Sequence, residues 1–188
     1  MKIGTHAHRK GNWKMRTGAA QLFAFVFVVV LALGASAAQD EKEKVAPHSR
    51  FEMFKKLAGE WVPVDPKPGA SLHITYKVVS NGSAVVETIG PDTAMEMITV
   101  IHRDGDDIEL THYCGIGNQP HMKAPDNAAG NTVAFKFTRA SNMKSEKDMH
   151  MHNVTYTFVD KDNLKTEWTN YSDGKPAGNM VFILKRKK

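Results

Sequence analysis

His150 and His152 are the residues whose type and spacing most directly suggest chemistry. In a β-strand, residues i and i+2 point to the same side with their Cα atoms about 6.5 to 7 Å apart, so two imidazoles can converge on one ligand or one metal ion. Both histidines share the parity of Val154, Tyr156 and Phe158, which are apolar and therefore expected to face inward. Burying two imidazoles without partners is costly, so we expect hydrogen bonds, water, a ligand or a metal around them.

His112 belongs to a second alternating pattern, in which it shares one face with Leu110 and Cys114. We expect this face to be inward as well. We therefore predict that His112, His150 and His152 line one polar patch of an enclosed interior. The alternative, which stays open, is that the two histidines of residues 150–152 stand at an exposed strand start and are merely solvated.

The same three histidines also suit a metal site, because neutral imidazoles bind zinc, copper or iron. Met143, Met149 and Met151 lie beside the histidine pair, and thioethers together with imidazoles are ligands that copper accepts. A periplasmic zinc- or copper-binding protein, or a metal-dependent enzyme using His112, His150 and His152, is thus the alternative function. Methionine is also an ordinary core filler, so these methionines do not decide between the two.

Other candidate residues are weaker. The glycine-rich, polar segment 115–122 predicts a loop at the rim of the patch, with His121 or the Asn118-Gln119 pair near the histidines. For Glu87 a solvated outer-face position is favoured over a buried ligand contact, and for Cys114 a buried, inert thiol is favoured over a nucleophile. Enzyme motifs for acyl transfer, phosphate binding, dinucleotide binding and zinc proteolysis are missing, so catalysis stays uncertain and less favoured than binding.

These residues lie in a stretch with the pattern of short strands joined by turns. Alternation of apolar and polar residues is visible in 72–78, 133–137, 154–158 and 182–184, and turn dipeptides include Asn81-Gly82, Asp104-Gly105 and Asp173-Gly174. About nine strands follow one another, and no helical pattern follows Leu57. Such regular short strands predict an all-β fold, a single antiparallel up-and-down β-barrel of about nine strands.

A short helix precedes the strands. Ser49 and Glu52 have the spacing of a capping box, and Phe51, Phe54 and Leu57 make one apolar stripe. The next glycine, Gly59, supplies a stop signal. We expect this helix to lie as a plug across one end of the core.

The sequence Gly59-Glu60-Trp61 after a short helix, followed by consecutive hairpins, resembles the calycin superfamily of lipocalins and fatty-acid-binding proteins. In that superfamily the tryptophan of a G-x-W motif packs over the closed end of the barrel against a basic side chain from the last strand. The resemblance assigns these roles to Trp61 and Arg186. Residues 81–88 and 110–114 also resemble exported bacterial lipocalin-like domains of unknown function. The resemblance covers roughly residues 51–188 and implies a fold and a cavity, but no particular ligand.

The first hypothesis is therefore an exported binding barrel that holds a small, mostly apolar ligand or cofactor in its lumen. The residues expected to line the lumen are Leu72, Ile74, Tyr76, Leu110, Phe135, Phe137, Tyr156, Phe158 and Trp168, with His112 and His152 as polar contacts. The resemblance makes haem one candidate occupant, since some small calycin-like barrels bind it through one histidine; the cofactor is otherwise unknown. A third possibility is a barrel filled by its own side chains that serves a protein contact.

The N-terminal segment predicts export. Residues 22–33 form an unbroken apolar run of 12, which suits a signal-peptide core and is shorter than the about 20 residues that a membrane span needs. Basic residues precede the run, no acid occurs in the first 38 positions, and small residues follow. The expected organisation is a cleaved signal peptide at 1–38, a flexible linker at 39–48 and a folded domain at 49–188. An uncleaved N-terminal anchor is the alternative.

The composition limits which classes of binding partner are expected. All five excess positive charges lie in the leader, so the remaining chain has 20 basic and 20 acidic residues, and the pI of 9.2 is no evidence for nucleic-acid or membrane binding. A single cysteine excludes an intrachain disulfide. We therefore expect a secreted or periplasmic protein with no nucleic-acid partner and no membrane span after leader removal. The oligomeric state stays open.

Overall fold

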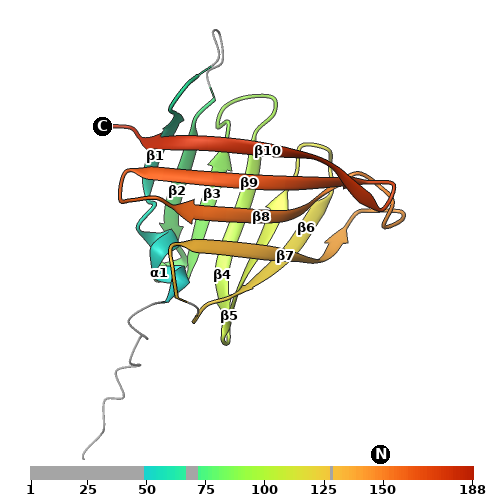
Figure 1. Ribbon diagram of the computed structural model, residues 1–188, viewed down its shortest axis with the longest axis horizontal. Coiled ribbons are helices and arrows are strands. Elements are labelled where there is room, and N and C mark those ends of the chain that lie inside the picture. The colour runs from blue at the N-terminus through green and yellow to red at the C-terminus, as the bar shows by residue number, and fades with distance from the viewer. Residues whose placement is uncertain (1–48, 67–71, 128) are drawn as a thin grey trace, which may run out of the picture. The chain divides into compact units, whose positions relative to one another are not determined.

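The computed structural model describes residues 49–66, 72–127 and 129–188. Within these ranges the chain forms a short α-helix and ten antiparallel strands (Figure 1). The elements are α1 (Arg50–Lys55), β1 (Gly59–Pro63), β2 (Ile74–Val79), a 3-10 turn (Ser80–Gly82), β3 (Ala84–Ile89), β4 (Met97–Asp104), β5 (Asp107–Tyr113), β6 (Gln119–Pro125), β7 (Thr132–Ser141), β8 (His150–Phe158), β9 (Asn163–Ser172) and β10 (Lys175–Arg186). The predicted leader and linker, residues 1–48, lie outside the described residues.

The strands close into one barrel. From β2 to β10 each strand pairs with its neighbour in sequence, and β1 pairs with both β2 and β10. This confirms the predicted all-β, single antiparallel up-and-down barrel with a short N-terminal helix. A closed barrel leaves no unpaired sheet edge, which removes the main route to edge-to-edge aggregation.

The structure has one strand more than the about nine predicted, because β6 occupies part of the segment expected to be a loop. Its inward positions Pro120, Met122 and Ala124 are buried, whereas His121 lies between them on the outer side. The expectation of a rim loop was therefore wrong for residues 119–122. The period-two signal was weak because a proline and a small alanine occupy two of the three inward positions, and proline is unusual within a sheet.

The inward face of the barrel follows the predicted alternation over most of its length. Six residues expected in the lumen are buried: Ile74, Tyr76, Leu110, Phe135, Tyr156 and Trp168. Leu72, Phe137 and Phe158 are partly buried. The lumen is thus lined by apolar and aromatic side chains, as the strand patterns predicted.

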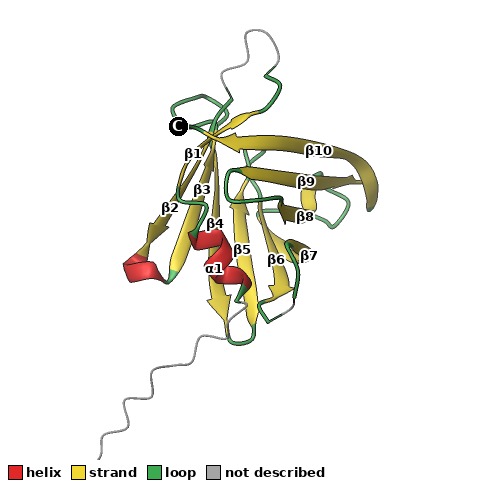
Figure 2. Ribbon diagram, turned by 60° about the vertical axis from the view of Figure 1, so that its left-hand side comes forward, coloured by secondary structure: helices red, strands yellow, loops and turns green. Residues whose placement is uncertain are grey.

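Helix α1 lies across one end of the barrel, which Figure 2 turns toward the reader. Its Phe54 is fully buried and makes edge contacts with Phe135, Tyr156 and Phe158 at ring-centroid distances of 5.8, 5.0 and 5.1 Å. The predicted stripe of Phe51, Phe54 and Leu57 is buried throughout. The helix is therefore the expected plug, and it fills this end with aromatic side chains.

The N-terminus of α1 is capped by a residue distant in sequence. Ser49 makes no capping bond to the helix, so the predicted capping box with Glu52 was wrong. The buried carboxylate of Asp126 instead accepts the backbone N–H of Phe51 at 2.8 Å and the Ser49 hydroxyl at 2.9 Å, and it pairs with Arg103 at 2.9 Å. A carboxylate near the positive end of the helix dipole is stabilising.

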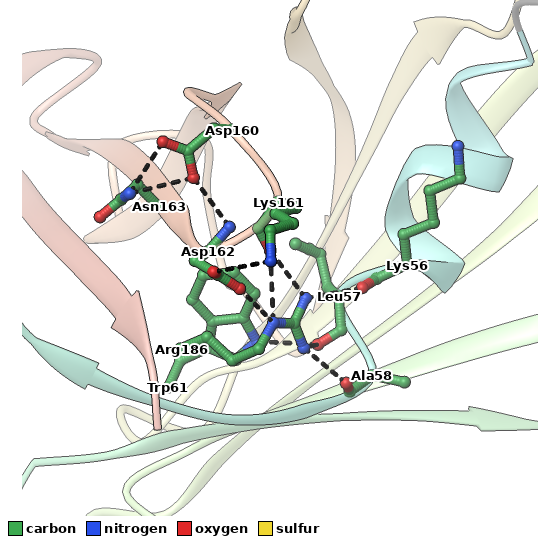
Figure 3. A network of polar contacts seen from close by, with 9 residues as sticks. All are labelled: Lys56, Leu57, Ala58, Trp61, Asp160, Lys161, Asp162, Asn163 and Arg186. Atoms are coloured by element: carbon green, nitrogen blue, oxygen red, sulfur yellow. Dashed lines mark hydrogen bonds and ion pairs between the residues drawn. The ribbon is translucent and has the colours of Figure 1, made fainter. Parts of the chain in front are cut away.

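Arg186 locks the helix to the barrel (Figure 3). Its guanidinium lies 4.5 Å from the centroid of the Trp61 ring and donates hydrogen bonds to the carbonyls of Ala58 and Lys56, both at 2.8 Å. The Trp61 indole N–H donates to the carbonyl of Leu57 at 2.8 Å. The packing of Trp61 against a basic residue of the last strand, implied by the calycin resemblance, is confirmed.

The backbone conformation of Gly59 accounts for the glycine of the G-x-W motif. The helix already ends at Lys55, so Gly59 is not its stop but the first residue of β1. Its φ of +127° suits glycine alone, and a Cβ there would lie 3.3 Å from Nη1 of Arg186. A larger residue would strain the backbone and press on the guanidinium.

Candidate functional site

Four buried polar side chains form a row across four neighbouring strands of the lumen. Tyr76 on β2 lies opposite Glu87 on β3, Glu87 lies opposite Thr99 on β4, and Thr99 lies opposite His112 on β5. All four are buried and face inward with the core residues of their strands. We call Tyr76, Glu87, Thr99 and His112 the polar row.

Glu87 is the charged member of the polar row, and it is 1% exposed. Its two carboxylate oxygens accept the hydroxyls of Tyr76 at 2.5 Å and Tyr156 at 3.1 Å, and Thr99 donates a third hydrogen bond. Burial raises the pKa of Glu87 above its usual value, and the three hydroxyls only partly oppose that rise. No Lys or Arg among the described residues contributes to its pKa shift.

The two tyrosines remain hydroxyl donors. Burial and the nearby Glu87 hold the pKa of Tyr76 and of Tyr156 well above the usual value, so neither ionises near neutral pH. An ionised carboxylate is an acceptor only, so it is the form of Glu87 that pairs with all three hydroxyls. In its ionised form Glu87 is thus a buried negative group stabilised by hydroxyl donors, with no basic side chain among the causes of its pKa shift.

The outer-face position favoured for Glu87 was wrong. Val85 and Ile89, two residues to either side, are buried, and Glu87 shares their face. The available signal was this parity, together with the tyrosines at inward positions of other strands.

His112 faces the lumen as predicted, and its protonation follows from its neighbours. Its Nδ1 lies 3.0 Å from the Thr99 hydroxyl oxygen. When Glu87 is ionised, Thr99 uses its single proton toward it, so Nδ1 carries the proton of the His112 ring. Burial lowers the pKa of His112 to about 4, so the ring is neutral at pH 7. Its Nε2 is then a bare acceptor.

Three buried polar atoms next to the polar row have no hydrogen-bond partner within the described structure. They are Nε2 of His112, Nε1 of Trp168 and Oγ1 of Thr166. The rings of His112 and Trp168 are in contact, with centroids 4.7 Å apart, and Thr166 is the previous inward residue on the strand of Trp168. Buried polar groups are nearly always paired in native proteins, so unpaired atoms on two touching rings and at the next inward position of β9 indicate a place for a bound molecule or ordered water.

A cavity of about 220 Å³ opens at the end of the barrel where β8 begins and β9 ends. Its lining comprises Met95, Met97, Cys114, Gly115, Ile116, Met149, His150, Met151, Asn170 and Met180. We call it the mouth cavity. Five methionines around one cavity give an apolar surface that changes shape easily, because methionine is unbranched and has several rotatable bonds.

The mouth cavity is lined by chain neighbours of His112 and Trp168. Met97 on β4 is two residues from Thr99, and Cys114, just past the end of β5, is two residues from His112. Met180 on β10 is the cross-strand neighbour of Trp168. One inward step is about 6.5 to 7 Å between Cα atoms, so the cavity lining begins about one such step from Thr99 and His112 of the polar row.

His150 and His152 form a separate cluster at the rim. The Nδ1 of His150 donates to the carbonyl of Asp148 at 2.8 Å, and its Nε2 lies 3.0 Å from Nδ1 of His152. The His152 ring is stacked between Phe137 and Tyr171, at centroid distances of 4.5 and 3.7 Å. Burial first, then His150 and Lys136, lower the pKa of His152.

The period-two register assumed for residues 150–158 is broken by a bulge. The pairing with β9 shifts between Met151 and Asn153, which leaves His152 as the extra residue. His150 is 2% exposed, so the alternative of an exposed, solvated strand start is wrong for this residue. His152 is half-buried. A bulge re-aims side chains, and here it turns the two imidazoles toward each other.

The structure does not bring the three histidines together as metal ligands. His112 is bonded within the polar row, and His150 and His152 are bonded to each other. Among residues 49–66, 72–127 and 129–188, no three His, Cys, Asp or Glu side chains are arranged to hold a metal ion.

The remaining candidates divide between rim and outer face. His121 bonds the Thr111 hydroxyl at 3.0 Å on the outer side of the sheet and takes no part in the site. Asn118 does lie at the rim, where its amide donates to the carbonyl of Met149 at 2.7 Å. Among the residues predicted to contact a ligand, Phe135 packs against Phe54 at the helix end, away from the mouth cavity.

Comparison with protein-family models finds no matching family, and comparison with curated proteins finds no matching relative. In the part of the chain that the structure describes, no helix has both the length and the apolar character needed to cross a membrane. The function is therefore inferred from the geometry of the lumen.

Proposed function

We propose that this protein is an exported binding barrel that takes a small, mostly apolar molecule through the mouth cavity into its lumen. One observation carries the proposal: Nε2 of His112 and Nε1 of Trp168 are buried without partners among the described residues, two residues along the chain from Cys114 and Asn170 of the apolar cavity. Concave, mainly apolar sites with a few oriented polar groups are typical of small-molecule binding.

The two ends of the barrel support this direction of entry. At the helix end, Phe54 fills the interior and Arg186 ties the helix to the strands. At the other end, Met95, Met149 and Met180 are exposed around the cavity. Exposed apolar side chains gathered around an opening are what an entry site for an apolar molecule needs.

Calycin-like membership and export complete the proposal. The closed barrel, the plug helix and the Trp61–Arg186 contact support a calycin-like binding protein. The basic, apolar and small-residue succession of residues 1–38 supports a cleaved signal peptide and a secreted or periplasmic location. The intact mass of the exported protein tests the second part: we expect a chain that starts at Ala38 or Gln39, and an uncut chain would contradict it.

Binding is tested with a neutral apolar fluorophore, N-phenyl-1-naphthylamine, titrated into the exported protein. We expect saturable fluorescence enhancement that Cys114→Phe abolishes, because the phenyl ring fills much of the 220 Å³ cavity. The matched control is Tyr113→Trp, which adds bulk at the neighbouring residue on the exposed side of the strand. Far-UV circular dichroism establishes that both variants fold.

Two results would contradict the binding proposal. One is an absence of saturable enhancement with the unmodified protein. The other is equal loss of enhancement in folded Cys114→Phe and Tyr113→Trp variants, which would place the fluorophore on the outer surface.

A further inference from the structure

Resting on the proposed function, we infer that the bound molecule presents an uncharged hydroxyl group, as an alcohol or a phenol does, to His112, Trp168 and Thr166. The lumen selects this group over a carboxylate. The inference follows from which atoms lack partners, which of them donate and which accept, and what charge already stands beside them.

The unpaired atoms have complementary needs. Nε2 of His112 accepts a hydrogen bond, because the ring proton is on Nδ1 toward Thr99. Nε1 of Trp168 only donates. A single group that both donates and accepts therefore satisfies both rings, which lie in contact at 4.7 Å between centroids. A hydroxyl does this, and the Thr166 hydroxyl, one inward position from Trp168 on β9, can serve as donor or acceptor to the same bound molecule.

A carboxylate fits this place poorly. It only accepts, so it would leave the lone pair of His112 Nε2 facing an anion. It would also bring a second negative charge into the space that holds Glu87, whose partners are the hydroxyls of Tyr76, Tyr156 and Thr99. Like charges in a buried site disfavour each other strongly.

The inward-register arginines, which could neutralise a bound carboxylate, lie away from the polar row. Arg103 and Arg186 are the arginines whose strand register matches inward residues, since they lie opposite Ile108 and Trp61. Arg103 pairs with Asp126 beside the helix N-terminus, and Arg186 lies over Trp61. Both are at the helix end, so the described polar row lacks the basic partner that an anionic head group requires.

An ammonium group is the third head-group class. It would donate to His112 Nε2 and be attracted by Glu87, but it cannot accept the N–H of Trp168. A buried donor left facing a cation is unfavourable. We therefore expect the order of affinity to be alcohol first, amine second and carboxylate last.

The test uses three molecules with the same eight-carbon chain at pH 7.5: 1-octanol, octylamine and octanoate. Each competes with N-phenyl-1-naphthylamine for the exported protein. We expect 1-octanol to bind at least tenfold more tightly than octanoate. Octanoate binding as well as or better than 1-octanol would overturn the inference, and octylamine binding best would replace it with a cationic ligand.

Two variants test whether the lumen produces the selectivity for an alcohol over a carboxylate. Glu87→Gln removes the buried charge while keeping the side-chain shape, and we expect it to narrow the alcohol-to-carboxylate ratio at least threefold. Glu109→Gln is the matched control, because Glu109 is an outward carboxylate on β5 that pairs with Lys123 at 2.6 Å. An unchanged ratio in folded Glu87→Gln would overturn the assignment of selectivity to the polar row.

The two proposals fail separately. If neither the fluorophore nor any eight-carbon molecule binds, the proposed binding function fails. If they bind without the predicted order, the binding function stands and the hydroxyl inference fails.

Discussion

Trp61 and Trp168 are equally inaccessible to water, at 0% and 2% exposed, yet their indole N–H groups have opposite surroundings. The Trp61 N–H donates to the carbonyl of Leu57 at 2.8 Å, and its ring lies under Arg186. The Trp168 N–H has no partner among the described residues, and its ring contacts that of His112, whose Nε2 also has none there. One tryptophan has its donor paired within the protein, and the other has a buried donor that no described residue accepts.

This difference separates stability from function. A buried donor or acceptor without a partner costs about 1 to 3 kcal/mol, so a domain selected only for stability would not keep several together. Local rules are typically broken at functional sites, where the cost is offset elsewhere. The helix end, with its filled aromatic core and the hydrogen bonds of Trp61, Asp126 and Arg186, is where the barrel offsets it.

Phe54→Ala gives the largest expected effect, because it breaks the helix end. The substitution empties a fully buried aromatic position between Phe135, Tyr156 and Phe158. We expect the free energy of unfolding in urea to fall by about 3 to 5 kcal/mol. Ile183→Ala, on the exposed side of β10, is the control and should change it by less than about 0.5 kcal/mol. Equal effects would mean that the helix end is not the stabilising half.

The next largest expected effect is a pH dependence of the free energy of unfolding that comes from His112. Its pKa is about 4 in the folded protein against 6.5 for the free side chain, because burial disfavours the charged ring. A lowered histidine pKa contributes stability that is fully present above pH 6.5 and is lost as the pH falls toward 4, by about 3 kcal/mol in total. Urea unfolding of the wild type and His112→Gln across this range measures the difference.

The direction of this pH dependence distinguishes His112 from Glu87. The raised pKa of Glu87 acts in the opposite direction, since its contribution is present below pH 4.5 and is lost as the pH rises. We therefore expect the wild type to lose more stability on acidification than His112→Gln. Parallel curves for the two proteins would contradict a buried, neutral His112.

Arg186→Met sharpens the comparison at the helix end. It keeps much of the aliphatic stem over Trp61 but removes the donors to the carbonyls of Ala58 and Lys56. We expect a loss of about 2 kcal/mol in the free energy of unfolding, since charged donors to carbonyls contribute about 1.5 to 3 kcal/mol. Lys185→Met, at the adjacent exposed position, should have little effect.

Thr166→Val gives the smallest effect and the opposite sign. The Thr166 hydroxyl is buried without a partner, so an apolar side chain of the same shape should stabilise the ligand-free protein by about 1 kcal/mol. The same change should weaken 1-octanol binding. Thermal unfolding with and without 1-octanol measures both, and a destabilised ligand-free variant would show that the hydroxyl is already satisfied.

The sequence predicted the helix end better than the site. The stripe of Phe51, Phe54 and Leu57 and the pairing of Trp61 with Arg186 follow from local periodicity and one motif, and both are present. The barrel itself was predicted because alternation extends over most strands. These features depend on patterns that a single sequence displays.

The site depends on pairings across strands, which a single sequence does not display. Glu87 became interpretable only when the register placed it between Tyr76 and Thr99. The bulge at His152 shifts the register by one residue, and no glycine or proline marks it. The unpaired Nε1 of Trp168 is a property of its surroundings, and alternation predicted only that its ring faces inward.

The indole N–H resonances of the two tryptophans test the central claim most directly. In a ¹H–¹⁵N spectrum of the protein titrated with 1-octanol, we expect the Trp168 indole signal to move progressively downfield as its N–H gains an acceptor. The Trp61 signal should stay in place, because its N–H is already bonded to Leu57. Single Trp→Phe variants assign the signals, including that of Trp13 if the leader is retained. A Trp168 signal that does not move at saturating 1-octanol, or moves no more than that of Trp61, would contradict the claim.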